Sequence, residues 1–95
     1  MKHCIIAKFN DSVSDKAAMT SQIEELFSSA PAMDGIHGHT VLRNCIDREN
    51  RYDLAIVIDM DKDALPAWDA SELHRAWKSR FGSYLTSKAI FDFES

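Results

Sequence analysis

The chain is poor in cysteine, which narrows the classes of protein to which it can belong. Its two cysteines, Cys4 and Cys45, stand in no recognisable motif within 95 residues. A disulfide-stapled secreted domain needs several cysteines at regular spacings. We therefore expect two reduced thiols, no Cys4–Cys45 disulfide, and a cytoplasmic location.

Positive charge and long apolar runs are scarce as well. Lys and Arg number 11 against 15 Asp and Glu, a formal net charge of -4, and no cluster of basic residues interrupts that balance. Nucleic acids and anionic membranes both require a basic surface, so neither is an expected partner. The chain runs from Met1 straight into a strand-like segment, which does not resemble a signal peptide, and no segment is long enough to span a bilayer.

The motifs that bind cofactors or activate nucleophiles are absent too. There is no glycine-rich phosphate loop, no G-x-S-x-G elbow, and no cysteine with a plausible activating partner. The sequence therefore predicts no cofactor.

What the chain does contain is the composition of one small globular domain, covering residues 1–95. Its hydrophobic content of 45% is ordinary for a folded protein. Alternating or continuous apolar runs predict strands at 2–9, 36–44, 52–60 and 86–93. A helix capped by Ser14 is expected before Pro31, a short one after Asp61 or Asp63, and one capped by Ser71 that ends near Gly82.

This order, β-α-β-β-α-β, predicts a ferredoxin-like α+β fold: a four-stranded antiparallel sheet with helices on one face. In that topology the first and last strands are antiparallel neighbours. His3, near the start of one, then lies opposite Asp92, near the end of the other.

The sheet face away from the helices is expected to be too apolar for water. By alternation it carries Cys4, Ile6, Val41, Ala55, Val57, Ala89, Phe91 and Phe93. A second copy of the same sheet is the simplest cover. We therefore expect a homodimer formed through Ile6, Val57, Phe91 and Phe93.

Three residues are candidates for acid–base chemistry: His3, His74 and Asp92. A carboxylate bonded to one imidazole nitrogen fixes the tautomer and raises the basicity of the other, which prepares a general base. A buried pair that only satisfies two polar groups is the alternative for His3 and Asp92. A half-exposed helix residue is the alternative for His74.

His37 and His39 form an H-x-H pair whose spacing suits two ligands of one metal. No further ligand is apparent nearby in the sequence, so we expect no metal site. By parity with Val41, both histidines are expected on the dimer-facing side, as a polar part of the interface or sheet edge.

Several short segments together resemble the stress-responsive A/B barrel (Dabb) family across essentially the whole chain. They are Lys2-His3 with the apolar run to Phe9, Pro31 through Gly35-Ile36, Arg43-Asn44, Tyr52-Asp53-Leu54-Ala55, Leu73-His74 and Phe91-Asp92-Phe93. The resemblance implies a dimeric α+β barrel with a cavity between sheet and helices in each subunit. Some plant members are cofactor-free polyketide cyclases that use cavity histidines and an aspartate.

Carried over one residue at a time, the resemblance implies that His3, His74 and Asp92 match the cyclases' catalytic histidines and aspartate. Leu54 stands where the cyclases have a third histidine, and Trp68 where they have a tyrosine. The residues expected to line the cavity are Ile5, Ile23, Phe27, Leu54, Trp68 and Trp77, with plain core packing as the alternative for Phe27 and Trp77.

These observations leave three functions open. The first is binding of a small apolar or aromatic molecule, which Leu54 and Trp68 favour. The second is a cofactor-free, cyclase- or lyase-like enzyme acting on a carbonyl compound, which His3, His74 and Asp92 favour. The third is a structural or interaction module whose core leaves no open cavity.

Overall fold

The strands and helices follow the predicted order in the computed structural model, which describes residues 1–94. The strands are β1 Lys2–Phe9, β2 Ile36–Arg43, β3 Leu54–Met60 and β4 Leu85–Phe93. The α-helices are α1 Lys16–Phe27, α2 Leu65–Asp69 and α3 Glu72–Phe81, joined by the 3₁₀ turns η1 Ala30–Ala32, η2 Lys62–Ala64 and η3 Gly82–Tyr84. The α+β ferredoxin-like prediction is therefore confirmed, including a second helical part that is divided in two.

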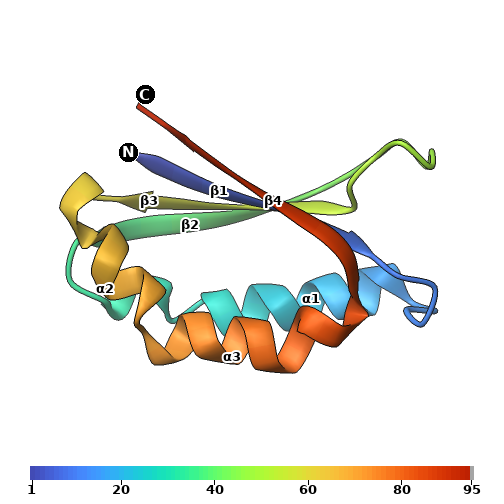
Figure 1. Cartoon of the computed structure of the whole chain (residues 1–95), viewed down its shortest axis with the longest axis horizontal. Coiled ribbons are helices and arrows are strands. Elements are labelled where there is room, and N and C mark those ends of the chain that lie inside the picture. The colour runs from blue at the N-terminus through green and yellow to red at the C-terminus, as the bar shows by residue number, and fades with distance from the viewer. Residues whose placement is uncertain (95) are drawn as a thin grey trace.

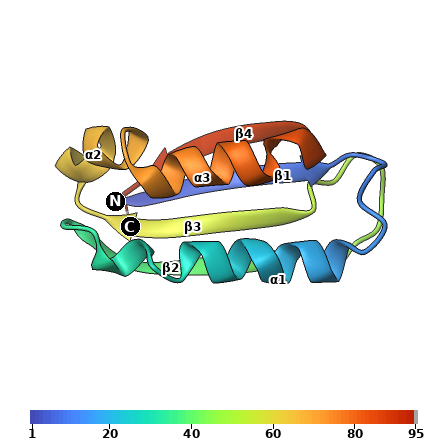
Figure 2. The same cartoon turned by 90° about the horizontal axis from the view of Figure 1, so that it is seen from below.

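The four strands form one antiparallel sheet in the order β2-β3-β1-β4. Helices α1 and α3 lie on one side of it, and no helix covers the other side in the described chain (Figure 1). Seen from below, α1 runs along the β2 side of the sheet and α3 along the β1–β4 side (Figure 2). Strand β4 is consequently an edge strand with α3 as its neighbouring helix.

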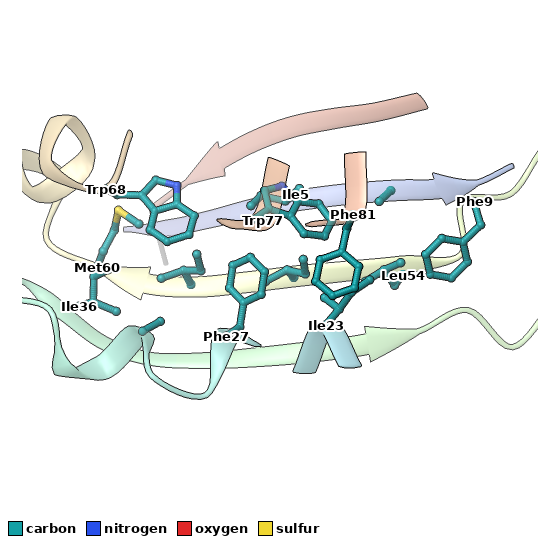
Figure 3. Packing of buried hydrophobic residues seen from close by; sticks show 14 residues of the cluster. Ile5, Phe9, Ile23, Phe27, Ile36, Leu54, Met60, Trp68, Trp77 and Phe81 are labelled. Carbon is teal, nitrogen blue, oxygen red and sulfur yellow. The ribbon is translucent and has the colours of Figure 1, made fainter. Parts of the chain in front are cut away.

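The core fills the layer between the sheet and the two long helices (Figure 3). Its largest fully buried side chains are Trp68, Trp77, Phe27, Ile5, Ile23, Ile56, Ile58 and Met60. The aromatic rings contact one another, with centroids 5.8 Å apart for Phe27 and Trp68 and 5.6 Å apart for Phe27 and Trp77. Burial of such side chains contributes about 1.5–3 kcal/mol each.

The start of α1 differs from the sequence-based expectation. Asp15, not Ser14, is the N-cap, and its carboxylate accepts a 3.0 Å hydrogen bond from the N–H of Ala18. Both residue types cap helices well, so the sequence alone does not choose between them. The Ser71 cap of α3 is as predicted, and its side chain accepts from the N–H of His74.

One irregularity changes which residues face the helices along β2. The pairing of β2 with β3 shifts between Ile36 and Gly38, so His37 is an extra residue in the strand. A bulge of this kind reverses the alternation of faces beyond it. Val41 therefore pairs with Ile56 and packs against the core. Its expected place on the sheet face away from the helices, which we call the open sheet face, is wrong.

The open sheet face is apolar even without Val41. Register places Ala55, Val57, Ala89, Phe91 and Phe93 beside residues of β1 on this face, and Leu42 takes the position expected for Val41. Phe91 is 62% exposed and Leu42 is 52% exposed. A contiguous apolar surface of this kind is typical of a protein–protein interface.

The two cysteines lie in different environments and are both free thiols. Cys4 is buried in β1, where burial, with the nearby charge of Asp92, raises the pKa of its thiol. Cys45 is exposed and follows the end of β2. Among residues 1–94, no helix has the length and apolar content needed to cross a membrane.

Gly35 provides a test of the turn that leads into β2. Its φ of +82° is unfavourable for residues with a Cβ, and an added Cβ would lie 2.8 Å from the Cβ of Ala64. Gly35→Ala should lower the free energy of unfolding by about 1–2 kcal/mol or more in urea denaturation. Gly38→Ala is the control, because a Cβ there meets no atom within 4 Å; equal effects of the two changes would contradict this account.

Candidate functional site

The antiparallel pairing of β1 with β4 brings the first candidate pair together. His3 lies opposite Asp92 in the register, and its Nδ1 contacts the Oδ1 of Asp92. His3 is 5% exposed, whereas the Asp92 side chain is 37% exposed. The predicted pairing is confirmed, and it joins a buried imidazole to a carboxylate that reaches solvent.

This contact determines how neutral His3 can act. A carboxylate only accepts hydrogen bonds, so Nδ1 carries the proton and donates it to Asp92. Nε2 is then the nitrogen with a free lone pair. A histidine arranged in this way is suited to accept a proton from a bound molecule.

His74 is held by the local structure at the start of α3. Its Nδ1 lies 2.9 Å from the carbonyl oxygen of Asp69, which can only accept, so neutral His74 also carries its proton on Nδ1. The Trp68 ring lies near both histidines, with centroids 6.3 Å from His3 and 5.2 Å from His74. Each of the two histidines thus has one nitrogen anchored and the other available.

Both histidines border one pocket of about 350 Å³ between α3 and the edge strand β4. Its lining residues are His3, Ile5, Leu65, Asp69, His74, Trp77, Lys78, Lys88, Ile90 and Asp92. This volume lies in the range of about 300–1,000 Å³ that is typical of small-molecule sites. The three residues predicted to carry chemistry therefore meet at a single cavity.

A second pocket of about 300 Å³ continues the first along β4. It is lined by Trp77, Lys78, Gly82, Leu85, Thr86, Ser87 and Lys88. The two pockets share Trp77, Lys78 and Lys88, so they adjoin at these side chains. We call the pair of pockets the α3–β4 groove.

The apolar residues expected to line the cavity are only partly at the groove. Ile5 and Trp77 line it. Ile23, Phe27 and Trp68 are fully buried in the core, and Leu54 pairs with Ala7, well along the sheet from His3. These four residues were expected at the cavity wall but do not line the groove. The aromatic rings fill the centre of the layer and leave the opening at its β4 edge.

Sequence reasoning missed five lining residues: Leu65, Asp69, Lys78, Lys88 and Ile90. The sequence does contain a pattern that indicates some of these lining residues: Lys88, Ile90 and Asp92 alternate along β4 and so face the same way. Lys78 follows His74 by four residues, which places both on one side of a helix. The contribution of Leu65 and Asp69 depends on how α2 packs, which no local pattern indicates.

The H-x-H pair does not act as a unit. His37, in the bulge of β2, is exposed and its Nε2 lies 2.8 Å from Oδ1 of Asp61. His39 pairs with Ile58, so it faces the helix side and not the expected dimer side. Over the described chain, no three His, Cys, Asp or Glu side chains are grouped so as to hold a metal ion.

Trp68 carries an unusual feature for a core residue. Its indole Nε1 is buried and has no hydrogen-bond partner within residues 1–94. An unsatisfied buried donor costs about 1–3 kcal/mol. The ring contributes to stability through packing, not through its polar atom.

Comparison with known proteins adds the family and the fold. A profile of the family described as Dabb, the stress responsive A/B barrel domain, matches residues 1–95. A dimeric ferredoxin-like protein of unknown function from Thermobifida fusca is 22% identical, with a TM-score of 0.82 over 99% of this chain and 89% of that chain. A similar dimeric protein of unknown function from Bacteroides fragilis is 20% identical, with a TM-score of 0.81 over 99% of this chain and 94% of that one.

A solved enzyme also has this fold. The hydroxynitrile lyase from Passiflora edulis is 9% identical, with a TM-score of 0.76 over 97% of this chain and 89% of the lyase chain. At these identities the likeness shows the fold alone. No curated protein sequence matches the chain.

Proposed function

The chain belongs to the stress responsive A/B barrel domain family, and on that premise we propose that it is a cofactor-free acid–base catalyst acting on a small aromatic or apolar carbonyl compound. The observation that supports this most is the meeting of His3, Asp92 and His74 at one pocket of about 350 Å³. The fold itself is compatible with catalysis, because a hydroxynitrile lyase shares it.

The composition of the pocket favours catalysis over binding alone. Leu54 and Trp68, which favour simple binding of an apolar molecule, are in the core and not among the lining residues. His3, His74 and Asp92, the residues that favour catalysis, line the pocket instead. The open volume beside His3 argues against a structural module with a filled core.

The proposed chemistry is proton transfer at a carbon beside a carbonyl group. Nε2 of His3 accepts the proton, the electrons of the broken C–H bond form a C=C bond, and the π electrons of the C=O bond move onto the oxygen, which gives an enolate. His74, when protonated on Nε2, donates to that oxygen. Return of a proton from His3 to the carbon restores the catalyst, and Asp92 stabilises the positive His3 ring in between.

We propose in addition that two chains associate through the open sheet face, with Ile6, Val57, Phe91 and Phe93 at the interface. The similar structures from Thermobifida fusca and Bacteroides fragilis are described as dimeric, which supports self-association. The α3–β4 groove is on the helix side of the sheet, so such an interface leaves it free.

The catalytic proposal can be tested with phenylacetone, a small aromatic ketone whose α-hydrogens exchange slowly with solvent. The protein should accelerate incorporation of deuterium from heavy water, followed by loss of the α-proton signals in ¹H NMR. His3→Gln should reduce this acceleration by about 10²–10⁴-fold, the usual contribution of a general base.

The matched control is His37→Gln, which removes an exposed histidine bonded to Asp61 outside the groove. It should exchange phenylacetone like the unmodified protein. The absence of any acceleration, or an equal loss in both variants, would refute the role proposed for His3.

A further inference from the structure

Two lysines line the α3–β4 groove where its two pockets adjoin. Lys88 lies opposite Ala7 in the register, and Ala7 is fully buried in the helix-facing core, so Lys88 is on the helix-facing side of β4. Lys78 comes from α3, on the other wall. Lys78 and Lys88 each line the two pockets of the groove.

Neither lysine is neutralised by the protein. Among residues 1–94, no carboxylate forms an ion pair with Lys78 or Lys88, although Lys2, Lys16 and Lys62 each have one. The pocket nearer Leu85 contains no carboxylate, so its only charges are these two. The other pocket has two carboxylates: Asp92, which contacts His3, and Asp69 at the end of α2.

Each lysine has a structural role when taken alone. An inward-facing lysine on an edge strand discourages pairing with other strands, which suits Lys88, and Lys78 lies in the last turn of α3, where a cation complements the helix dipole. Neither role accounts for the meeting of both lysines at one groove. Two unpaired cations that converge on a largely apolar cavity are the arrangement that recognises an anion attached to an apolar body.

We propose that the natural ligand is an organic anion, an aromatic or apolar carbonyl compound with a carboxylate held between Lys78 and Lys88. This inference rests on the proposed use of the groove as the substrate site and adds the charge of the substrate. The carboxylate lies at the junction of the two pockets. The carbonyl group is then directed towards His3 and His74, and the apolar part lies against Trp77 and Ile5.

A matched pair of probes tests the charge directly. Phenylpyruvate and phenylacetone share a benzyl group and a carbonyl, and differ in having a carboxylate or a methyl group. Amide shifts of ¹⁵N-labelled protein give the Kd of each. Phenylpyruvate should bind about tenfold more tightly, since a partly exposed ion pair adds up to about fivefold in affinity.

Substitutions then assign the preference to the two lysines. Lys78→Gln and Lys88→Gln should each reduce the Kd ratio about threefold, and the double variant should remove it, while the Kd of phenylacetone stays unchanged. Arg48→Gln removes one positive charge from the 44–53 loop, outside the groove, and should leave the ratio as it was. Raising salt from about 0.02 M to about 0.5 M should also reduce the ratio, because screening weakens exposed charge pairs.

Two results would overturn the inference: equal Kd values for the two probes, or a preference that survives in the double variant. The readout is binding, so it is separate from catalysis. A lysine-dependent preference without deuterium exchange would refute the proposed acid–base function and leave the anion site in place. Deuterium exchange of both probes, together with equal Kd values, would refute the anion site and leave the proposed acid–base function in place.

Discussion

Phe91→Asp and Val57→Asp should each yield aggregated or unfolded chains, and not a folded monomer. Phe91 is 62% exposed in the single chain, on the open sheet face that we propose as the dimer interface. In a symmetric dimer each substitution occurs twice, and each aspartate would be buried without a partner, which costs several kcal/mol. A chain of 95 residues has little stability to spare for that loss.

Light scattering after size exclusion gives the mass of the particles, and circular dichroism reports whether they are folded. Tyr84→Asp is the matched control, because Tyr84 is 37% exposed in η3, outside the sheet. It should remain a folded dimer. A monomeric unmodified protein at micromolar concentration, or a folded monomer of Phe91→Asp, would contradict the proposed interface.

Much of the fold could be predicted because local and long-range patterns agree. The apolar runs at both ends of the chain, with the β-α-β-β-α-β order, already place β1 beside β4. The His3–Asp92 pairing then follows from the register, and the structure has it. The bulge at His37 was missed although Gly38, an isolated glycine inside the strand pattern, is a signal for one, and this error moved Val41 to the wrong face.

The position of the cavity was harder to predict than the residues that carry its chemistry. Periodicity shows that Ile23 and Phe27 face inward, but it cannot show whether the space they face is filled. That depends on how the rings of Phe27, Trp68 and Trp77 fit together, which is a property of the packed molecule. The opening lies instead at the β4 edge, where exposed residues such as Lys88 and Ile90 form the wall.

The electrostatic design of the groove follows from its place at an edge. A cavity in the centre of the layer would enclose charged groups at a high cost in desolvation. At the β4 edge, Asp92 and the two lysines keep access to water while His3 is buried beside them. Charged groups can therefore act on a bound molecule here without each needing a partner inside the protein.

Asp92→Asn should reduce the proposed exchange reaction about 10²–10⁴-fold and leave the dimer folded. Asparagine is similar in shape to aspartate but can donate a hydrogen bond through its amide, so it no longer requires the proton of His3 to be on Nδ1. The tautomer with the proton on Nε2 then becomes populated, and that nitrogen cannot accept a proton from a substrate. The loss should be in kcat, with KM for phenylacetone little changed, since Asp92 acts through His3.

Asp69→Asn is the matched control, because it removes the other carboxylate of the pocket and the same charge, and His74 contacts only the backbone carbonyl of Asp69. It should keep most of the activity. Long-range ¹H–¹⁵N spectra of the imidazole rings report the tautomer directly, and only Asp92→Asn should change the His3 signals. If both variants lost activity equally, or if the His3 ring kept its tautomer in Asp92→Asn, the pair would be a structural contact and not the means by which the base is prepared.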